Sequence, residues 1–107
     1  MPVIRIDYDK EKLKDEDVLV LSNAVQKIVS EATKIEDVFV YANSPHIKVK
    51  IAPVEIFVQM SAHKITDEDT LVSEIKSKLS VWKKESNFQH LINLTLIPMK
   101  WKIEIGI

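Results

Sequence analysis

The sequence predicts an α+β fold in which a strand–helix–strand unit occurs twice and builds one mixed β-sheet, with both helices on one face. Short stretches in which apolar and polar residues alternate indicate strands, and two stretches with apolar residues at helical spacing indicate helices. In chain order these stretches are strand, helix and strand, followed by the same three again. Packing both helices on one face is the most economical arrangement for such a sheet.

The two halves of the chain resemble each other. A shift of 52 residues places the acidic residues 15–17 on the acidic residues 67–69. Chance similarity between two amphipathic units is the alternative interpretation, and the order of the elements does not depend on it. A chain of 107 residues has the length of one domain. We therefore expect a single domain over 1–107, with pseudo-repeats at about 2–51 and 54–107.

The first unit begins with a strand at 3–8, in which Ile4 and Ile6 share one face and Arg5 lies on the other. The acidic residues 15–17 favour a helix start, because negative charge complements the positive end of the helix dipole. The helix that follows carries an apolar stripe, which consists of Val18, Leu21, Val25, Ile28 and Ala32. Residues 38–42 predict the second strand, which an Asn-Ser-Pro turn ends.

Residues 46–51 alternate again, and residues 54–62 predict the first strand of the second unit. Thr66 is the predicted N-cap of the second helix, with Asp69 as its capping-box partner. The buried stripe of that helix consists of Val72, Ile75, Leu79 and Trp82. Two more strands are predicted after it, at 90–97 and 101–107, with Pro98 breaking the chain between them.

The predicted strands at 38–42 and 54–62 carry apolar residues at both parities, for example Phe39 next to Val38. A sheet with one face in water shows a cleaner alternation. We therefore expect another subunit to cover the second face. Loops or a small local core are the alternative cover.

Composition excludes several classes of function. Fifteen basic and sixteen acidic residues nearly cancel, and the single arginine, Arg5, argues against nucleic-acid recognition. The single glycine, Gly106, rules out a phosphate-binding loop. There is no cysteine and the histidines His46, His63 and His90 lie in separate segments, so we expect neither a metal nor a cofactor. No apolar run is long enough for a membrane and no signal-peptide pattern is present, so we expect a cytoplasmic protein.

Met-Pro at the start, an immediate strand and a tandem βαβ unit resemble the tautomerase superfamily. Residues 57–65 (FVQMSAHKI) are similar to the strand-to-loop segment of 5-carboxymethyl-2-hydroxymuconate isomerase and macrophage migration inhibitory factor. Residues 31–40 (EATKIEDVFV) resemble their helix-to-strand turn. The resemblance implies this fold, a homotrimer and an isomerase that acts on a small 2-oxo or 2-hydroxy acid.

The resemblance also implies that Pro2 is the catalytic base. Members of the family lose the initiator methionine, and the secondary amine of the proline then accepts the proton. General chemistry agrees, because a free α-amino group has a pKa of about 7.7–8.0 and apolar surroundings lower it. Such an amine is suited to move a proton from carbon beside a carbonyl. An ordinary first residue of a strand is the alternative role for Pro2. With Met1 attached, the Pro2 nitrogen is an amide and has no basic lone pair.

Four further residues are predicted to bind substrate. Family members that act on dicarboxylates hold them with arginines, which this chain lacks near its matching segments. Lys34, at the turn into the second strand, matches a pocket lysine of the inhibitory factor, and Lys64 is similarly placed. The backbone N–H of Ala62 is placed to polarise a carbonyl, and Tyr41 to close the pocket or donate a hydrogen bond. Solvated lysines and a buried strand tyrosine are the alternatives.

Two other hypotheses stay open. In one, the chain is a catalytically degenerate relative that serves as a binding or assembly domain. In the other, it is a ferredoxin-like ligand-binding module. Both stay open because a fold alone does not fix function. Removal of Met1 separates the enzyme from the degenerate relative.

Overall fold

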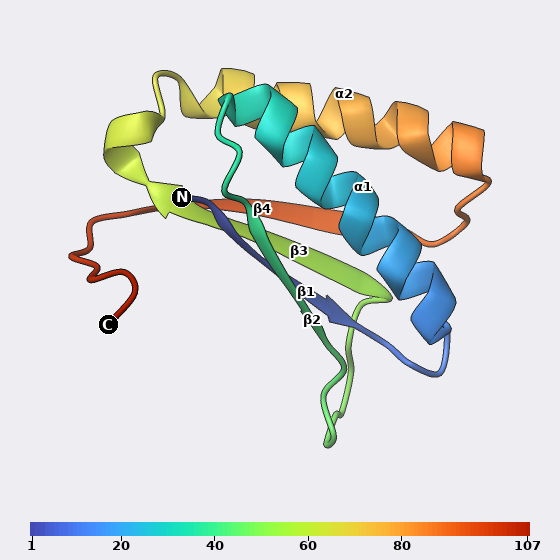
Figure 1. Cartoon of the computed structure of the whole chain (residues 1–107). Helices are drawn as coiled ribbons and strands as arrows, with labels where there is room; N and C mark the ends of the chain where they lie inside the picture. The colour runs from blue at the N-terminus through green and yellow to red at the C-terminus, as the bar shows by residue number, and fades with distance from the viewer.

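The predicted strand–helix–strand order is present twice in a computed structural model, which describes all of residues 1–107 (Figure 1). The strands and helices are β1 (Val3–Tyr8), α1 (Asp15–Thr33), β2 (Phe39–Asn43), β3 (Val54–Ser61), the short 3-10 helix η1 (Ala62–Lys64), α2 (Glu68–Ser86) and β4 (Ile92–Met99). Both long helices have 19 residues. Neither helix combines the length and the apolar character that crossing a membrane requires.

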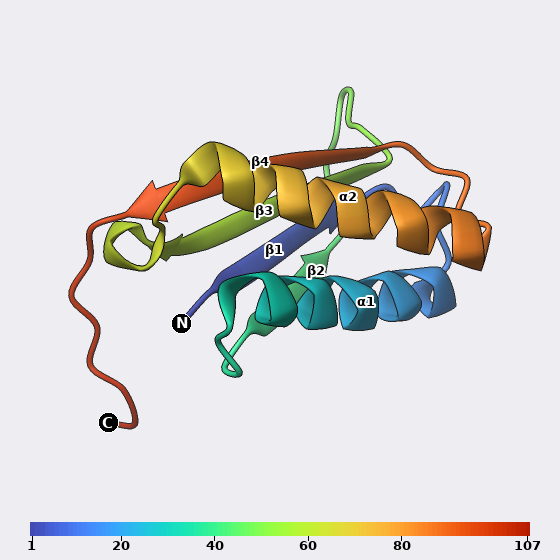
Figure 2. The ribbon, with the colours of Figure 1, turned by 90° about the horizontal axis from the view of Figure 1, so that it is seen from above.

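The four strands form one mixed sheet in the order β2-β1-β3-β4. β1 pairs with β2 in parallel and with β3 in antiparallel orientation, and β3 pairs with β4 in parallel. Each parallel pair is joined by a crossover helix, as parallel strands require. Figure 2 shows that α1 and α2 lie side by side over the same face. The predicted fold class is therefore confirmed.

The core lies between this face and the helices. Ile4 and Ile6 of β1 and Ile56 and Val58 of β3 are completely buried, and their strand neighbours Arg5 and Phe57 are not. The helices contribute Val18, Leu21, Val25, Ile28 and Val29 from α1 and Ile75 and Leu79 from α2. Burying one such side chain contributes about 1.5–3 kcal/mol. Alternation in the strands and helical spacing in α1 and α2 together determine this layer.

The helix-free face of the sheet carries both apolar and polar side chains. Phe39 and Tyr41 are 44% and 58% exposed there. The Arg5 guanidinium lies 4.4 Å from the centre of the Phe57 ring, and its Nε is 3.2 Å from the Asp7 carboxylate. A single copy of the chain leaves this face open to solvent.

Two segments that were predicted to be strands are not strands. Residues 46–51 belong to the loop between β2 and β3, where Ile47 and Val49 are exposed. Residues 101–107 follow β4 without regular structure. An alternating sequence needs a neighbouring strand to pair with, and neither segment has one in the single chain.

The ends of two predicted elements also differ. The N-cap of α2 is Asp67, whose carboxylate accepts a hydrogen bond of 3.1 Å from the N–H of Thr70, so the prediction of Thr66 was wrong. Pro98 does not break the last strand, because β4 continues to Met99. β4 is an edge strand, where a missing N–H is tolerated on the solvent side.

Candidate active site

Pro2 lies at the end of the sheet where β1 and β2 begin and where β3 and β4 finish (Figure 1). Its ring is fully buried, and its carbonyl oxygen accepts a hydrogen bond of 3.1 Å from the N–H of Phe39. Continuing the two registers of β1 by one residue places Pro2 between Val38 and Met60, which are both buried. Pro2 is therefore held in apolar surroundings at the start of β1, an inner strand of the sheet.

Lys34 is placed near this end by the turn between α1 and β2. It follows the last residue of α1 in the left-handed conformation, with φ 61° and ψ 28°, and its side chain is exposed. Ser30 Oγ donates to the Ile35 carbonyl at 2.7 Å, and Gln26 Nε2 donates to the Val38 carbonyl at 3.0 Å. These two bonds fix the turn that carries Lys34. Sequence reasoning missed Gln26 and Ser30, whose four-residue spacing on the flank of the apolar stripe was the available signal.

Ala62 and Lys64 lie in η1, directly after the end of β3. The Ala62 carbonyl accepts a bond of 3.2 Å from the Ile65 N–H, which closes this short turn. Lys64 lines a cavity of about 230 Å³ together with Thr33, Ile65, Thr66, Asp67, Thr70, Leu71 and Glu74. The cavity joins the end of α1, η1 and the start of α2. The Thr70 N–H bond holds the pKa of Asp67 below its ordinary value, so this carboxylate stays ionised there.

Tyr41 is not brought to Pro2 within a single chain. It pairs in register with Arg5 and lies on the helix-free face, whereas Pro2 has the parity of the helix-facing residues Ile4 and Ile6. Arg5 also lies on the helix-free face, as its parity predicts. Pro2, Lys34, Ala62 and Lys64 thus share one end of the molecule, and Tyr41 lies on the opposite face of the sheet.

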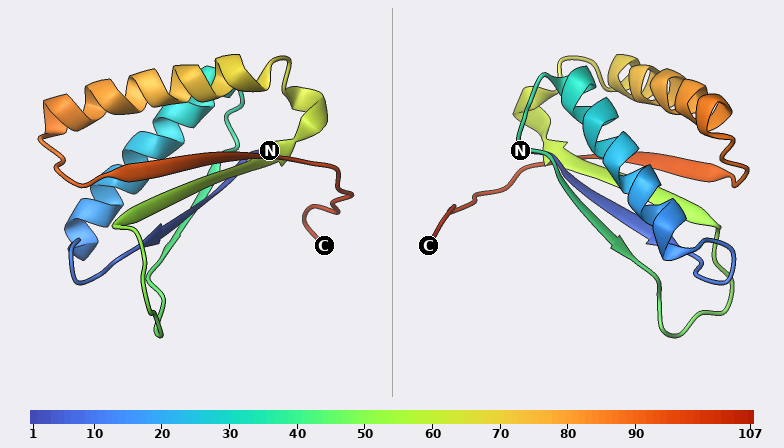
Figure 3. Two further views of the ribbon diagram at one scale, coloured as in Figure 1. Left: turned by 180° about the vertical axis from the view of Figure 1, so that it is seen from behind. Right: turned by 45° about the vertical axis from the view of Figure 1, so that its right-hand side comes forward.

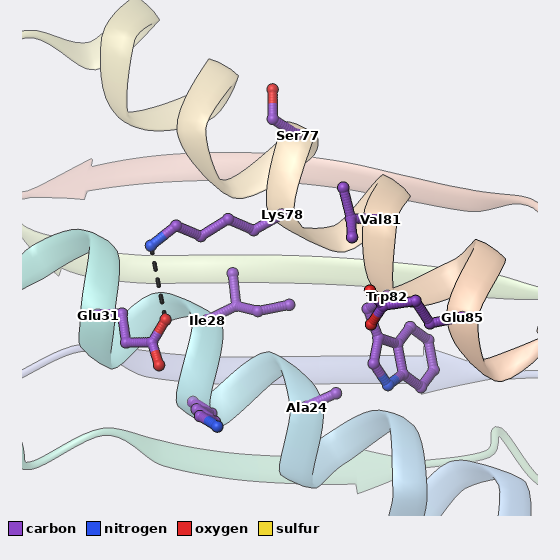
Figure 4. Close-up of a pocket in the computed structure, with 9 residues that line it drawn as sticks. Ala24, Ile28, Glu31, Ser77, Lys78, Val81, Trp82 and Glu85 are labelled. Carbon is purple, nitrogen blue, oxygen red and sulfur yellow. Dashed lines mark ion pairs between the residues drawn. The ribbon is translucent and has the colours of Figure 1, made fainter.

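Two cavities that are larger than the one beside Lys64 lie away from Pro2. One of about 420 Å³ opens between α1 and α2, where Ala24, Ile28, Val81 and Trp82 line an apolar floor (Figure 4). Lys78 Nζ lies 3.6 Å from the Glu31 carboxylate across it. Another of about 440 Å³ lies at the far end of the helix-free face, beside Phe57 and the loop between β2 and β3. Pro2 lines neither of them. No group of three or more His, Asp or Glu side chains is placed to hold a metal ion.

No protein-family model matches this sequence, and no curated protein matches it at a significant level. Solved structures do match its fold. 5-Carboxymethyl-2-hydroxymuconate delta-isomerase superposes with a TM-score of 0.66 at 12% sequence identity, over 99% of this chain and 89% of the other.

Two further solved structures share the same architecture. Malonate semialdehyde decarboxylase matches with a TM-score of 0.68 at 9% identity, over 97% of this chain and 92% of its own. Macrophage migration inhibitory factor from Oncomelania hupensis matches with a TM-score of 0.57 at 16% identity, over 92% and 74%. At these identities the likeness shows the fold, which is the one that the sequence resemblance implied.

Proposed function

We propose that this chain, which has the tautomerase-superfamily fold, is a cofactor-independent isomerase that moves a proton with the N-terminal amine of Pro2. The proposed reaction is keto–enol or double-bond isomerisation of a small 2-oxo or 2-hydroxy acid. The observation that carries the proposal is the position of Pro2, which is buried at the start of the inner strand β1 and held by the Phe39 N–H.

The surroundings of Pro2 support the role of a base. An amine between apolar neighbours such as Val38 and Met60 is harder to protonate, because burial disfavours the charged form. The proline ring also fixes the direction of the nitrogen lone pair, which favours a preorganised base. The proposal requires that Met1 is removed, because an amide nitrogen accepts no proton.

Lys34 and Lys64 are the proposed ligands of the substrate carboxylate. Both are exposed cations at the Pro2 end of the sheet, and Arg5 is directed to the other face. In this proposal the Ala62 N–H polarises the substrate carbonyl. Tyr41 has a role only at a boundary between copies, because it lies on the opposite face of its own sheet.

A homo-oligomer, and by the resemblance a trimer, is part of the proposal. The exposed Phe39 and Tyr41 on the helix-free face support association, since exposed aromatic side chains gain by burial. A single domain over 1–107 and a cytoplasmic location complete it.

The test combines intact mass with kinetics. The purified protein is expected to have lost Met1, and it is expected to ketonise 2-hydroxymuconate or the enol form of phenylpyruvate. Pro2→Ala is expected to lower kcat/KM by at least about 100-fold, the usual effect of a positioned acid–base group.

Pro45→Ala is the matched control, because Pro45 lies in the distant loop between β2 and β3. It is expected to leave the rate unchanged. Equal rates for the wild type and Pro2→Ala, or a retained Met1, would instead support a binding or assembly domain on the same fold.

A further inference from the structure

We infer that Gln26 of α1 is a positioning residue for the Pro2 base. Its side-chain amide holds the peptide group between Val38 and Phe39, and the same peptide group holds the carbonyl of Pro2. This deepens the proposed function and rests on it, because it names the residue outside the sheet that determines where the Pro2 amine lies.

Pro2 has only one backbone group that can pair with the sheet. Proline has no backbone N–H, and once Met1 is removed the Pro2 nitrogen is the reacting amine. The carbonyl is left, and it accepts the bond of 3.1 Å from the Phe39 N–H. The direction of the amine therefore depends on this bond and on the packing of the buried ring.

The peptide group that makes this bond is also held from its other side. Its two polar groups are the Val38 carbonyl and the Phe39 N–H, which point in opposite directions because the peptide bond is trans. The N–H points to Pro2, so the carbonyl points away from β1, toward the free edge of the sheet. Gln26 Nε2 donates to that carbonyl at 3.0 Å. The two hydrogen bonds thus share one peptide group.

Sharing a peptide group couples the two bonds. A donor at the Val38 carbonyl polarises the peptide group, which makes the Phe39 N–H a stronger donor to Pro2. The positive end of that N–H dipole points toward Pro2 and disfavours a positive charge on its amine. Gln26 therefore favours the neutral amine that the proposed reaction needs, and it also fixes the direction of the bond that holds Pro2.

Gln26 is well placed for this role because α1 is anchored in the core. Its helix neighbours Val25 and Ile28 are 2% and 8% exposed. In Figures 1 and 3 the connection from α1 descends from the helix layer and enters β2 beside the start of the chain. The bond from Gln26 links this helix layer directly to the first peptide group of β2.

The second bond from the same helix acts on a different point. Ser30 Oγ donates to the carbonyl of Ile35, the residue after Lys34. Gln26 acts three residues later, on the peptide group that bonds Pro2. Loss of the Gln26 bond is therefore expected to affect the base, and loss of the Ser30 bond to affect the proposed carboxylate ligand Lys34.

Gln26→Met tests the inference, because methionine keeps the length of the side chain and removes the donor. Gln26 is exposed, so the variant is expected to fold, which circular dichroism checks. Its kcat is expected to fall by about 3- to 10-fold with little change in KM, the effect of one hydrogen bond. The acid limb of the pH profile of kcat/KM is expected to move to higher pH, because the Pro2 amine becomes easier to protonate. A general loss of folded protein lowers the rate without moving that limb.

Amide hydrogen exchange, followed by NMR, gives a readout that needs no substrate. The Phe39 amide is expected to exchange faster in Gln26→Met than in the wild type, whereas the amide of Ile56, in the core, is expected to be unchanged. A titration of protein that carries ¹⁵N-labelled proline reports the pKa of the Pro2 amine directly. The charged side chains at this end are the same in every variant, and they are Lys34, Glu36, Asp37 and Lys64.

Ser30→Ala is the matched control, because it removes another donor of the same helix. It is expected to raise KM and to leave the acid limb in place. Gln89→Met is the remote control, in the connection between α2 and β4 at the other end of the sheet, and is expected to behave as the wild type.

An unchanged kcat in Gln26→Met, an effect on KM alone, or an equal effect of Gln89→Met would each overturn the inference. Wild-type exchange at Phe39 in Gln26→Met would also overturn it. A wild-type rate in Pro2→Ala would instead overturn the proposed chemistry, so the positioning and the chemistry can fail separately.

Discussion

Lys34 is in a backbone conformation that costs free energy, and it is also a proposed substrate ligand. A left-handed conformation costs a non-glycine residue about 1–2 kcal/mol. The helix ends here because the chain must turn from α1 to β2, and the bonds of Ser30 and Gln26 hold that turn. Asn87 has the same conformation after α2, with φ 55°, and asparagine tolerates it better than lysine.

Lys34→Gly is expected to stabilise the fold and to weaken substrate binding. Relief of the left-handed strain outweighs the added freedom of the unfolded chain, for a net gain of up to about 1 kcal/mol. Loss of the cation is expected to raise KM. Urea unfolding and steady-state kinetics measure the two effects. Lys34→Asn, which keeps the turn and removes the charge, is the control. A Lys34→Gly variant that is less stable than the wild type would contradict the stability prediction. An unchanged KM would contradict the role of Lys34 in substrate binding.

For single residues, the sequence predicts which side chains are candidates for the site better than it predicts where they lie. Pro2 at a strand start and Lys34 at the turn into β2 follow from the order of the elements. The place of Tyr41 does not follow, because the register between β1 and β2 decides whether Tyr41 and Pro2 lie on the same face of the sheet. That register cannot be predicted from the sequence of either strand alone.

The start of α2 is stabilised by its N-cap, because few of its apolar side chains are buried in the core. Only Ile75 and Leu79 of this helix are buried, against five residues of α1, so packing against the core stabilises α2 less. The Asp67 carboxylate satisfies the Thr70 N–H, one of the free donors at a helix start.

Asp67→Ala is expected to lower the melting temperature by several degrees, and Thr66→Ala by much less. The first removes the cap and leaves the Thr70 N–H without its partner. Thermal unfolding followed by circular dichroism compares the two. A larger effect for Thr66→Ala would return the cap to the residue that the sequence favoured.

Among the elements, the helices and the four paired strands could be predicted because each has its own periodicity. Residues 46–51 have a strand's periodicity too, yet remain a loop with Val49 fully exposed. Pairing is a property of two segments, and alternation within one segment does not supply the second. Pro98 shows the opposite case, in which a residue that normally ends a strand lies within one. β4 is an edge strand and accommodates a proline that an inner strand would exclude.

In the whole molecule, a charged contact ties together two loops that are distant in sequence. Lys48 Nζ, in the loop between β2 and β3, lies 2.6 Å from the Asp9 carboxylate, which is buried after β1. The Asp9 N–H also donates to the Pro53 carbonyl at 3.1 Å. The bond from Lys48 lowers the pKa of Asp9, and the same bond raises the pKa of Lys48.

Asp9→Asn is expected to destabilise the protein at pH 7 and much less at pH 3. A depressed carboxyl pKa stabilises the fold above its unfolded value, about 3.9, and this contribution is lost as the pH falls through the folded value. Lys48 carries its charge at both pH values, so the difference reports Asp9. Urea midpoints at the two pH values give the measurement. Asp37→Asn, an exposed carboxylate, is the control. If the wild type and Asp9→Asn differ in urea midpoint by the same amount at pH 7 and at pH 3, Asp9 does not act through its charge.

The place of β1 in the strand order has a consequence for synthesis on the ribosome. β1 is the first of the four strands to be made and is an inner strand. Its neighbour on one side, β2, follows with residues 39–43, and its neighbour on the other side, β3, only with residues 54–61. Until β3 is made, the edge of β1 that faces it has unpaired N–H and C=O groups. Such an edge can pair wrongly with another nascent chain on the same polysome. The interval is short, because the missing strand is the next one translated.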